Sequence, residues 1–468
     1  MRASSSSTAN APRAGWVAAA SFSISTGIPW PNCRSCRWPT LPNSCWIRHS
    51  TTSRRRPNPI LPGPYPCSAI ATRLPTSDMP ERALSRAEQR LSLAAIIASI
   101  SVFAFTLGLS SPILALILEA QGISAGLIGL NSAMTAVGIL ISAPFLPPLT
   151  RRLGIVRFML LCIVLCAVLL LALRAVPNFY LWFPLRLVLG FAINGLFVLS
   201  ETWINEIADD HNRGRLIGLY VTALAAAFAA GPLLIPIFGS QSWIPFLIGA
   251  AAISLAALPL VAVRHLAPSF EAAGSAGILA FFRLAPTLLA GAFLTAFVDA
   301  AALSLLPVYG MRLELGEAVA GLMVAALVFG NVIFQFPLGW LGDHMNRYRL
   351  LIICGLFGMA GALLLPALGG GPLRWPLLIV WGGLTYGVYA LSLTLLGERF
   401  RGTDLVAGNA AFAVMWGVGG ILGPLAGGSA MDAMGPQGLP LVLAAACLLF
   451  VVLAVYRQGR ALWRNRAS

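Results

Sequence analysis

Residues 112–127 read PILALILEAQGISAGL, and residues 307–322 read PVYGMRLELGEAVAGL. Both stretches begin at a proline near the end of a long apolar segment, and both end in Ala-Gly-Leu. A second series of motifs also occurs twice, because Leu-Ser, Arg-Gly and Gly-Pro follow one another over residues 199–232 and again over residues 391–424. A repeat of this length predicts that the chain is built from two related halves.

The repeated stretches belong to a very apolar chain. Of 468 residues, 58% are hydrophobic and 10% are charged, against roughly 25% charged in an ordinary soluble domain. About 20 apolar residues of helix cross a bilayer core. We therefore predict an all-α integral membrane protein with twelve transmembrane helices in two pseudo-symmetric six-helix bundles of the same orientation. The predicted spans are residues 93–118, 125–148, 156–174, 179–200, 215–237, 243–263, 286–309, 317–340, 350–368, 375–397, 405–429 and 438–456.

Composition divides the chain into five parts. Residues 1–78 are low-complexity and contain no span-length apolar stretch. A disordered arm and a targeting peptide are two interpretations of them. We favour a third, upstream DNA translated from a start placed too early, with Met79 as the true start. The other expected parts are an N-terminal bundle at 79–263, a cytoplasmic linker at 264–285, a C-terminal bundle at 286–456 and a basic cytoplasmic tail at 457–468.

The charges follow the predicted spans. The formal net charge of +15 would favour a nucleic-acid partner in a soluble protein. With the N-terminus inside, however, eighteen arginines face the cytoplasm, and three, Arg174, Arg312 and Arg374, face outward. This asymmetry is typical of positive-inside topology. We therefore expect a multi-pass protein of the bacterial inner membrane with both termini in the cytoplasm, surrounded by lipid, monomeric, and without a nucleic-acid partner.

The loop between the eighth and ninth predicted spans reads GWLGDHMNRYR over residues 339–349. It resembles the G-x-L-x-D-x-x-x-R signature of the major facilitator superfamily. A gating latch is expected here, with Gly339 allowing close helix approach, Asp343 accepting from a neighbouring helix N-terminus, and Arg347 and Arg349 pairing with acids or lipid phosphates. The corresponding first-half loop, residues 144–157, has no acid, so the two halves need not gate symmetrically.

Two further motifs carry the same resemblance. Arg186 and Gly190 are similar to the family's R-x-x-x-G motif, and residues 419–428, GGILGPLAGG, fit its G-x-x-x-G-P-x-x-G-G pattern. We interpret the second pattern as a helix-packing hinge. The hinge residues are Gly419, Gly423, Pro424, Gly427 and Gly428, with Gly231 and Pro232 as the first-half remnant. The segments Glu201–Trp203 and Leu306–Tyr309 look like the bacterial YcaD-like subgroup.

Ionisable residues within spans are functional candidates because burying a charge in lipid is costly. Asp299, near the middle of the seventh span, is the best candidate for a proton or cation carrier. Its alternative is a permanent ion pair with Arg186. For Glu201 we expect a cytoplasmic network with Arg213 and Arg215 rather than a direct transport role. We interpret Glu119 and Asp432 as interfacial.

Polar and aromatic residues on apolar helices are candidates to line a central cavity. The first, fourth, seventh and tenth helices line the cavity in the superfamily that the chain resembles. The candidates for contact with substrate or protons are Arg186, Asn194, Asp299, Trp381, Tyr386, Tyr389, Asn131 and Gln335.

Other site classes find little support. Cys33 and Cys36 form a CxxC, but Cys45 and Cys67 do not complete a zinc framework, so we expect no metal and no cofactor. The chain has no phosphate-loop motif and no nucleophile–base set, which argues against an ATP-driven pump and an enzyme. We expect a secondary transporter of a small organic solute, coupled to protons and working by alternating access. An uncoupled facilitator, or a receptor or scaffold without transport, is the alternative.

Overall fold

A computed structural model of the chain describes residues 86–207, 213–264 and 278–467. The predicted arm at residues 1–78 lies outside these ranges. Within them the chain forms helices and turns, with no strand. The first half contains α1 (Arg86–Ala120), α2 (Ala125–Ser142), α3 (Leu146–Leu153), α4 (Ile155–Ala175), the 3-10 helix η1 (Phe179–Leu181), α5 (Trp182–Ile207), α6 (Arg213–Ala230), α7 (Leu234–Phe238), α8 (Ile244–Leu255) and α9 (Ala257–Ala262). The second half contains α10 (Ile278–Leu284), α11 (Pro286–Arg312), α12 (Glu317–His344), α13 (Arg347–Leu368), α14 (Arg374–Arg399), α15 (Gly402–Met434) and α16 (Gly438–Ala467).

Twelve candidate membrane spans are present in the described ranges, in agreement with the predicted number. Each overlaps one predicted span. The largest differences are extensions, because the second span continues through α3 to Leu153 and the fourth continues through α5 to Ile207. Helices satisfy every backbone polar group within the segment, which is why a lipid-embedded chain of this composition adopts them.

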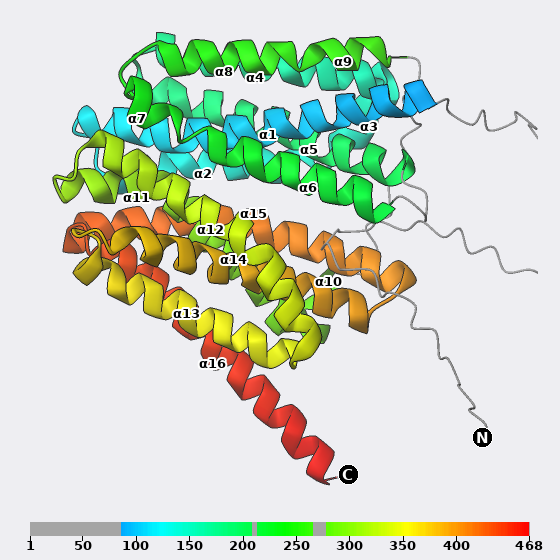
Figure 1. Ribbon diagram of the computed structural model, residues 1–468, viewed down its shortest axis with the longest axis vertical. Coiled ribbons are helices and arrows are strands. Elements are labelled where there is room, and N and C mark those ends of the chain that lie inside the picture. The colour runs from blue at the N-terminus through cyan, green and yellow to red at the C-terminus, as the bar shows by residue number, and fades with distance from the viewer. Residues whose placement is uncertain (1–85, 208–212, 265–277, 468) are drawn as a thin grey trace, which may run out of the picture. The chain divides into compact units, whose positions relative to one another are not determined.

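The two halves repeat the same packing. In each half the second and fourth spans, α2 with α5 and α12 with α14, cross with glycines against a backbone carbonyl of the partner helix. The glycines are Gly138 and Gly190 in the first half and Gly330 and Gly382 in the second. Gly190 follows Gly138 by as many residues as Gly382 follows Gly330. The repeat in the sequence is therefore also a repeat of helix contacts. Figure 1 shows the two halves in blue to green and in yellow-green to red.

The turns inside the opening repeat depend on glycine. Gly122, between α1 and α2, has a φ of 75°, and Gly316, before α12, has a φ of 79°. Residues with a Cβ rarely adopt this left-handed conformation. The two long helices that begin each half can therefore reverse direction within a few residues.

The seventh span, α11, is the most enclosed. Of its central window 83% is buried, whereas the corresponding share of the fifth span is 17%. Outer helices instead expose apolar side chains, such as Val164 on α4 and Leu449 on α16, at 57% and 72%. These side chains face the hydrocarbon, and α11 is placed where neighbouring helices surround it.

The helix ends form two regions. We call the end that contains Arg151, Arg347 and Arg399 the arginine-rich end, and the gating latch predicted for residues 339–349 belongs to it. We call the opposite end, which contains Glu119 and Asp432, the latch end. Between the halves, α10 occupies the end of the predicted linker, and α16 continues as a helix through the predicted tail to Ala467.

Candidate functional site

Asp299 lies midway along α11 and is 9% exposed. Its Oδ1 accepts a hydrogen bond from the hydroxyl of Tyr386 on α14. The two residues come from α11 and α14, and α11 is the most buried of the candidate spans, so the carboxyl group is held in the protein interior and away from lipid. A titratable group in such a position is a candidate to carry a proton.

Two cavities flank this pair. The larger, of about 360 Å³, lies between α6 of the first half and α12 and α14 of the second half, and Tyr386 lines it. The smaller, of about 50 Å³, is lined from α1, α2, α11 and α15, and Asp299 lines it. The hydrogen bond between Tyr386 and Asp299 therefore joins the walls of the two cavities.

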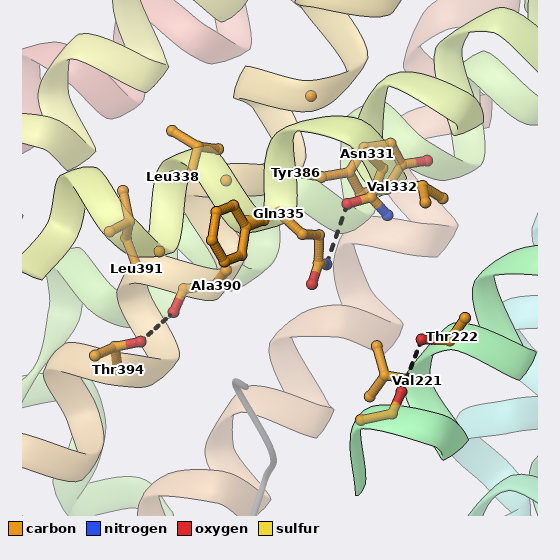
Figure 2. Close-up of a pocket in the computed structure, with 15 residues that line it drawn as sticks. Val221, Thr222, Asn331, Val332, Gln335, Leu338, Tyr386, Ala390, Leu391 and Thr394 are labelled. Atoms are coloured by element: carbon orange, nitrogen blue, oxygen red, sulfur yellow. Dashed lines mark hydrogen bonds between the residues drawn. The ribbon is translucent and has the colours of Figure 1, made fainter. Parts of the chain in front are cut away.

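Figure 2 shows the larger cavity, with side chains of α12 and α14 opposite Val221 and Thr222 of α6. Gln335 projects toward the open space, and its Nε2 donates to Oδ1 of Asn331 at 3.4 Å. Of the predicted cavity residues, Gln335 and Tyr386 line this space and Asp299 lines the smaller one.

Arg186 on α5 has no exposed surface. Its Nη1 donates to Oδ1 of Asn131 on α2 at 3.0 Å, while its Nε and Nη2 have no partner. The expected alternative of an Arg186–Asp299 ion pair is wrong for this structure, because each residue is bound elsewhere. The two side chains belong to different halves, and α5 presents Arg186 to its own neighbour α2.

The remaining predicted cavity residues lie in packing contacts. Asn194 donates from Nδ2 to Oγ of Ser142 at 2.7 Å, which ties α5 to α2. Trp381 is 1% exposed and packs against Gly361, so it joins α14 to α13. Tyr389 stacks edge-on against Trp416 with ring centroids 5.0 Å apart. Asn194, Trp381 and Tyr389 do not line either cavity.

Several lining residues were not predicted. Thr222 and Thr394 line the larger cavity, and Ser132, Thr135 and Trp416 line the smaller one. The two threonines donate to backbone carbonyls of their own helices, Gly218 and Ala390. Such residues are common in membrane helices, so their presence in one sequence carries no signal.

Glu201 lies beside a tyrosine from each half. Its carboxylate interacts electrostatically with Tyr220 on α6 and with Tyr389 on α14. The expected network with Arg215 is not formed, because Arg215 is exposed and makes no ion pair with Glu201. The side chain of Arg213 lies outside the described residues.

At the arginine-rich end, Arg347 joins two acids. Its Nη2 contacts Oδ1 of Asp343 at 2.6 Å, its Nη1 contacts Glu398, and its Nε donates to the carbonyl of Gly342 at 3.0 Å. These residues come from α12, α13 and α14, all in the second half, and Glu398 was not predicted. Arg349 is exposed. These three contacts of Arg347 lie within the second half.

Two expectations about this loop are wrong for this structure. A Cβ added to Gly339 would meet no atom within 4 Å, so Gly339 borders the larger cavity and not a close helix contact. Asp343 accepts from Arg347 instead of from a helix N-terminus. The physical reason is that Gly339 lies on the face of α12 that lines the cavity, while Arg347, four residues after Asp343, lies within reach of its carboxylate.

The predicted hinge glycines do lie at close helix contacts. Gly419 and Gly423 on α15 face the backbone of α11, and Gly427 faces side chains of α11 and α16. Gly428 faces the backbone of α2 at Ala125, so it lies between the halves. Gly231 and Pro232 occupy the break between α6 and α7, and Pro424 lies inside α15.

At the latch end, acidic side chains cross between the halves. Glu119 of α1 pairs with Arg312 of α11 at 2.8 Å. Asp432 of α15 accepts from the backbone N–H groups of Ala125 and Gly126, at the start of α2, both at 2.8 Å.

A third acid makes a similar contact at this end. Glu317 of α12 accepts from the backbone N–H of Ser240, between α7 and α8. We call Glu119, Glu317 and Asp432 the latch acids. Their contacts hold the halves together at the end remote from the arginine-rich one. Among the described residues, no cluster of His, Cys, Asp and Glu could hold a metal ion.

The family model of the Major Facilitator Superfamily matches residues 93–319 and 288–467. The chain belongs to this superfamily. Among its relatives, the MFS-type transporter YfkF of Bacillus subtilis is 27% identical over 343 residues, which are 70% of this chain and 86% of that protein. The MFS-type transporter YcaD of Salmonella typhimurium is 23% identical over 340 residues, or 71% of this chain and 87% of that one. The predicted YcaD-like character of this superfamily member is thereby confirmed.

Solved structures of superfamily members have the same fold. The nucleoside transporter NupG superposes with a TM-score of 0.66 at 14% identity, covering 78% of this chain and 98% of NupG. A bacterial homolog of the human lysosomal transporter Spinster, in an inward-facing and unoccupied conformation, gives a TM-score of 0.62 at 15% identity, covering 79% of this chain and 96% of that one. The predicted fold of twelve helices in two bundles is confirmed.

Proposed function

We propose that this superfamily member is a secondary active transporter that moves a small organic solute by alternating access and couples it to protons. The observation that carries the coupling is the buried Asp299 carboxyl group, which lines one cavity while its hydrogen-bond donor Tyr386 lines the other. Protonation of Asp299 would change its hydrogen bond with Tyr386, and a solute bound beside Tyr386 would change the same hydrogen bond. Coupling needs such a shared contact.

The proposed membrane orientation places the arginine-rich end in the cytoplasm of a bacterial inner membrane, because positively charged loops stay inside. The latch acids then close the outer side, and the larger cavity lies toward the inner side between α6, α12 and α14. This arrangement corresponds to an inward-facing state. The cluster of Asp343, Arg347 and Arg349 is proposed to contact the first half in the opposite state, with the α15 glycines as the hinge.

The experiment is transport by protein reconstituted in vesicles that contain a pH-sensitive dye, over a panel of organic solutes. For wild type we expect solute addition to drive proton movement and a pH gradient to drive accumulation. Asp299→Asn should lower solute-driven proton movement and uphill accumulation at least tenfold, while exchange of labelled for unlabelled solute persists, because a carboxamide cannot exchange a proton.

The matched control is Asp404→Asn, an exposed acid in the first turn of α15, which should behave as wild type. Equal loss of exchange and accumulation in Asp299→Asn would contradict coupling through this residue. Uphill accumulation unaffected by the substitution would likewise contradict a role of Asp299, whereas a wild type that only equilibrates the solute, without proton movement or accumulation, would support an uncoupled facilitator. No flux for any solute would favour a receptor or scaffold.

A further inference from the structure

The lining of the larger cavity is uncharged. Its fifteen residues include no Asp, Glu, His, Lys or Arg. The carboxyl group of Asp299 lines the other cavity and accepts from Tyr386. A charged solute would have to leave water without meeting an opposite charge, which costs several kcal/mol. The cavity therefore disfavours ions.

The polar groups that remain available are neutral amides. The hydroxyls of Thr222, Thr394 and Tyr386 donate to acceptors of the protein. Gln335 donates to Asn331, which leaves Oε1 of Gln335 and Nδ2 of Asn331 without a protein partner. One acceptor and one donor thus face the cavity, an arrangement suited to an uncharged hydrogen-bonding group of a ligand.

One wall of the cavity is apolar and exposed. Val332 and Phe336 of α12 line the cavity, yet they are 39% and 82% exposed. The next residue, Ile333, is 43% exposed without lining it. On the facing helix, Leu219 is an exposed apolar neighbour of the lining residue Gly218. The rim between α6 and α12 is therefore apolar and exposed, as a surface that borders the hydrocarbon of a bilayer must be.

We infer that the cargo is an uncharged, amphipathic organic molecule, and that it passes between this cavity and the bilayer sideways, through the rim formed by α6 and α12. The inference rests on the proposed transport function. A cavity of about 360 Å³ is within the range that holds small organic ligands. A molecule that partitions into lipid reaches the rim without crossing the polar loops.

The test uses two probes with one ring skeleton: uncharged N-phenyl-1-naphthylamine and its sulfonate, 8-anilino-1-naphthalenesulfonate. Binding to the full chain in lipid nanodiscs is measured by fluorescence after subtraction of empty nanodiscs. The uncharged probe should bind saturably and the sulfonate at least tenfold more weakly. Gln335→Leu should weaken the uncharged probe about three- to tenfold, which is the effect of one hydrogen bond.

Three variants test the location and the path. Gly339→Leu fills the cavity at a position with open space around it and should abolish saturable binding. Val332→Trp should slow probe entry at least threefold, whereas Ile333→Trp, one residue away and outside the lining, should not. Circular dichroism and size-exclusion chromatography establish that each variant is folded. If Val332→Trp does not fold, Phe336→Ala, which widens the same rim, tests the path and should speed probe entry.

Equal affinity for the sulfonate would overturn the uncharged class, and equal entry rates for the two tryptophan variants would overturn the lateral path. Unchanged binding in Gly339→Leu would overturn the assignment of the cavity. Equilibrium binding needs no pH gradient, so these outcomes leave the coupling proposal standing, and a failure of solute-driven proton movement leaves the cargo class standing.

Discussion

At the scale of single residues, a few side chains set the polar contacts of the interior. Arg186 is fully buried, and the one partner of its guanidinium is Asn131, with Nε and Nη2 unpartnered. A buried cation with so few acceptors is costly. Arg186 lies in the core of the first half and makes its hydrogen bond with Asn131 rather than with the Asp299–Tyr386 pair, so its role is tested separately.

Asn131→Leu should lower the free energy of unfolding by about 1–3 kcal/mol, because the guanidinium loses its acceptor. The double variant Asn131→Leu, Arg186→Leu should recover most of that loss, since both polar groups are then replaced by apolar ones. Thermal unfolding in detergent measures both. Additive losses in the double variant would argue against the pair.

Helix packing depends on glycine at specific contacts. Gly423 on α15 lies against the backbone of α11 at Phe297, while Gly459 on α16 has no atom within 4 Å of an added Cβ. The sequence pattern around Gly423 was predicted to be a hinge, and its glycines lie between helices. Gly459 also lies within a helix, but no neighbouring helix among the described residues packs against it.

Gly423→Ala should destabilise the protein by about 1–3 kcal/mol, because the added methyl group pushes α15 away from α11. Gly459→Ala should instead raise stability by up to about 1 kcal/mol, through helix propensity. Paired thermal melts of the two variants test this contrast. Similar melting temperatures for the two variants would show that widening the contact between α15 and α11 has no energetic cost.

For the whole molecule, we propose that the latch acids control which end is closed. Each of the three connects one half to the other at the latch end. Together they should contribute about 2–3 kcal/mol to this state, from one partly exposed ion pair, one helix N-terminus and one further backbone hydrogen bond. That amount shifts a two-state equilibrium by roughly 30- to 150-fold.

The triple variant Glu119→Gln, Glu317→Gln, Asp432→Asn should open the latch end. With cysteine at position 303, in the wall of the smaller cavity, and all native cysteines removed, an impermeant maleimide should label intact cells at least tenfold faster than in the parent. Glu314→Gln, an exposed acid at the same end, is the control. Unchanged labelling of the triple variant would argue against a latch.

The sequence predicted several residues of the candidate site but not the contacts between them. Asp299, Tyr386 and Gln335 were predicted as cavity residues and line cavities, but the sequence did not pair Asp299 with Tyr386. Asn194 and Trp381 were predicted alongside them and lie in helix contacts. An error of one residue in helical phase rotates a side chain by about 100°, so apolar helices with scattered polar residues leave the facing direction undetermined.

The fold itself was predictable from the chain alone, because lipid imposes a local rule: each span must be apolar and must satisfy its own backbone, so length, repeat and arginine placement identify the spans one at a time. The contacts between halves obey no local rule. Asp432 binds the N–H of Ala125, 307 residues away, while Asp343, in the recognised signature, binds four residues along its own chain. Which acid caps which helix depends on how two bundles meet, and that is a property of the folded molecule.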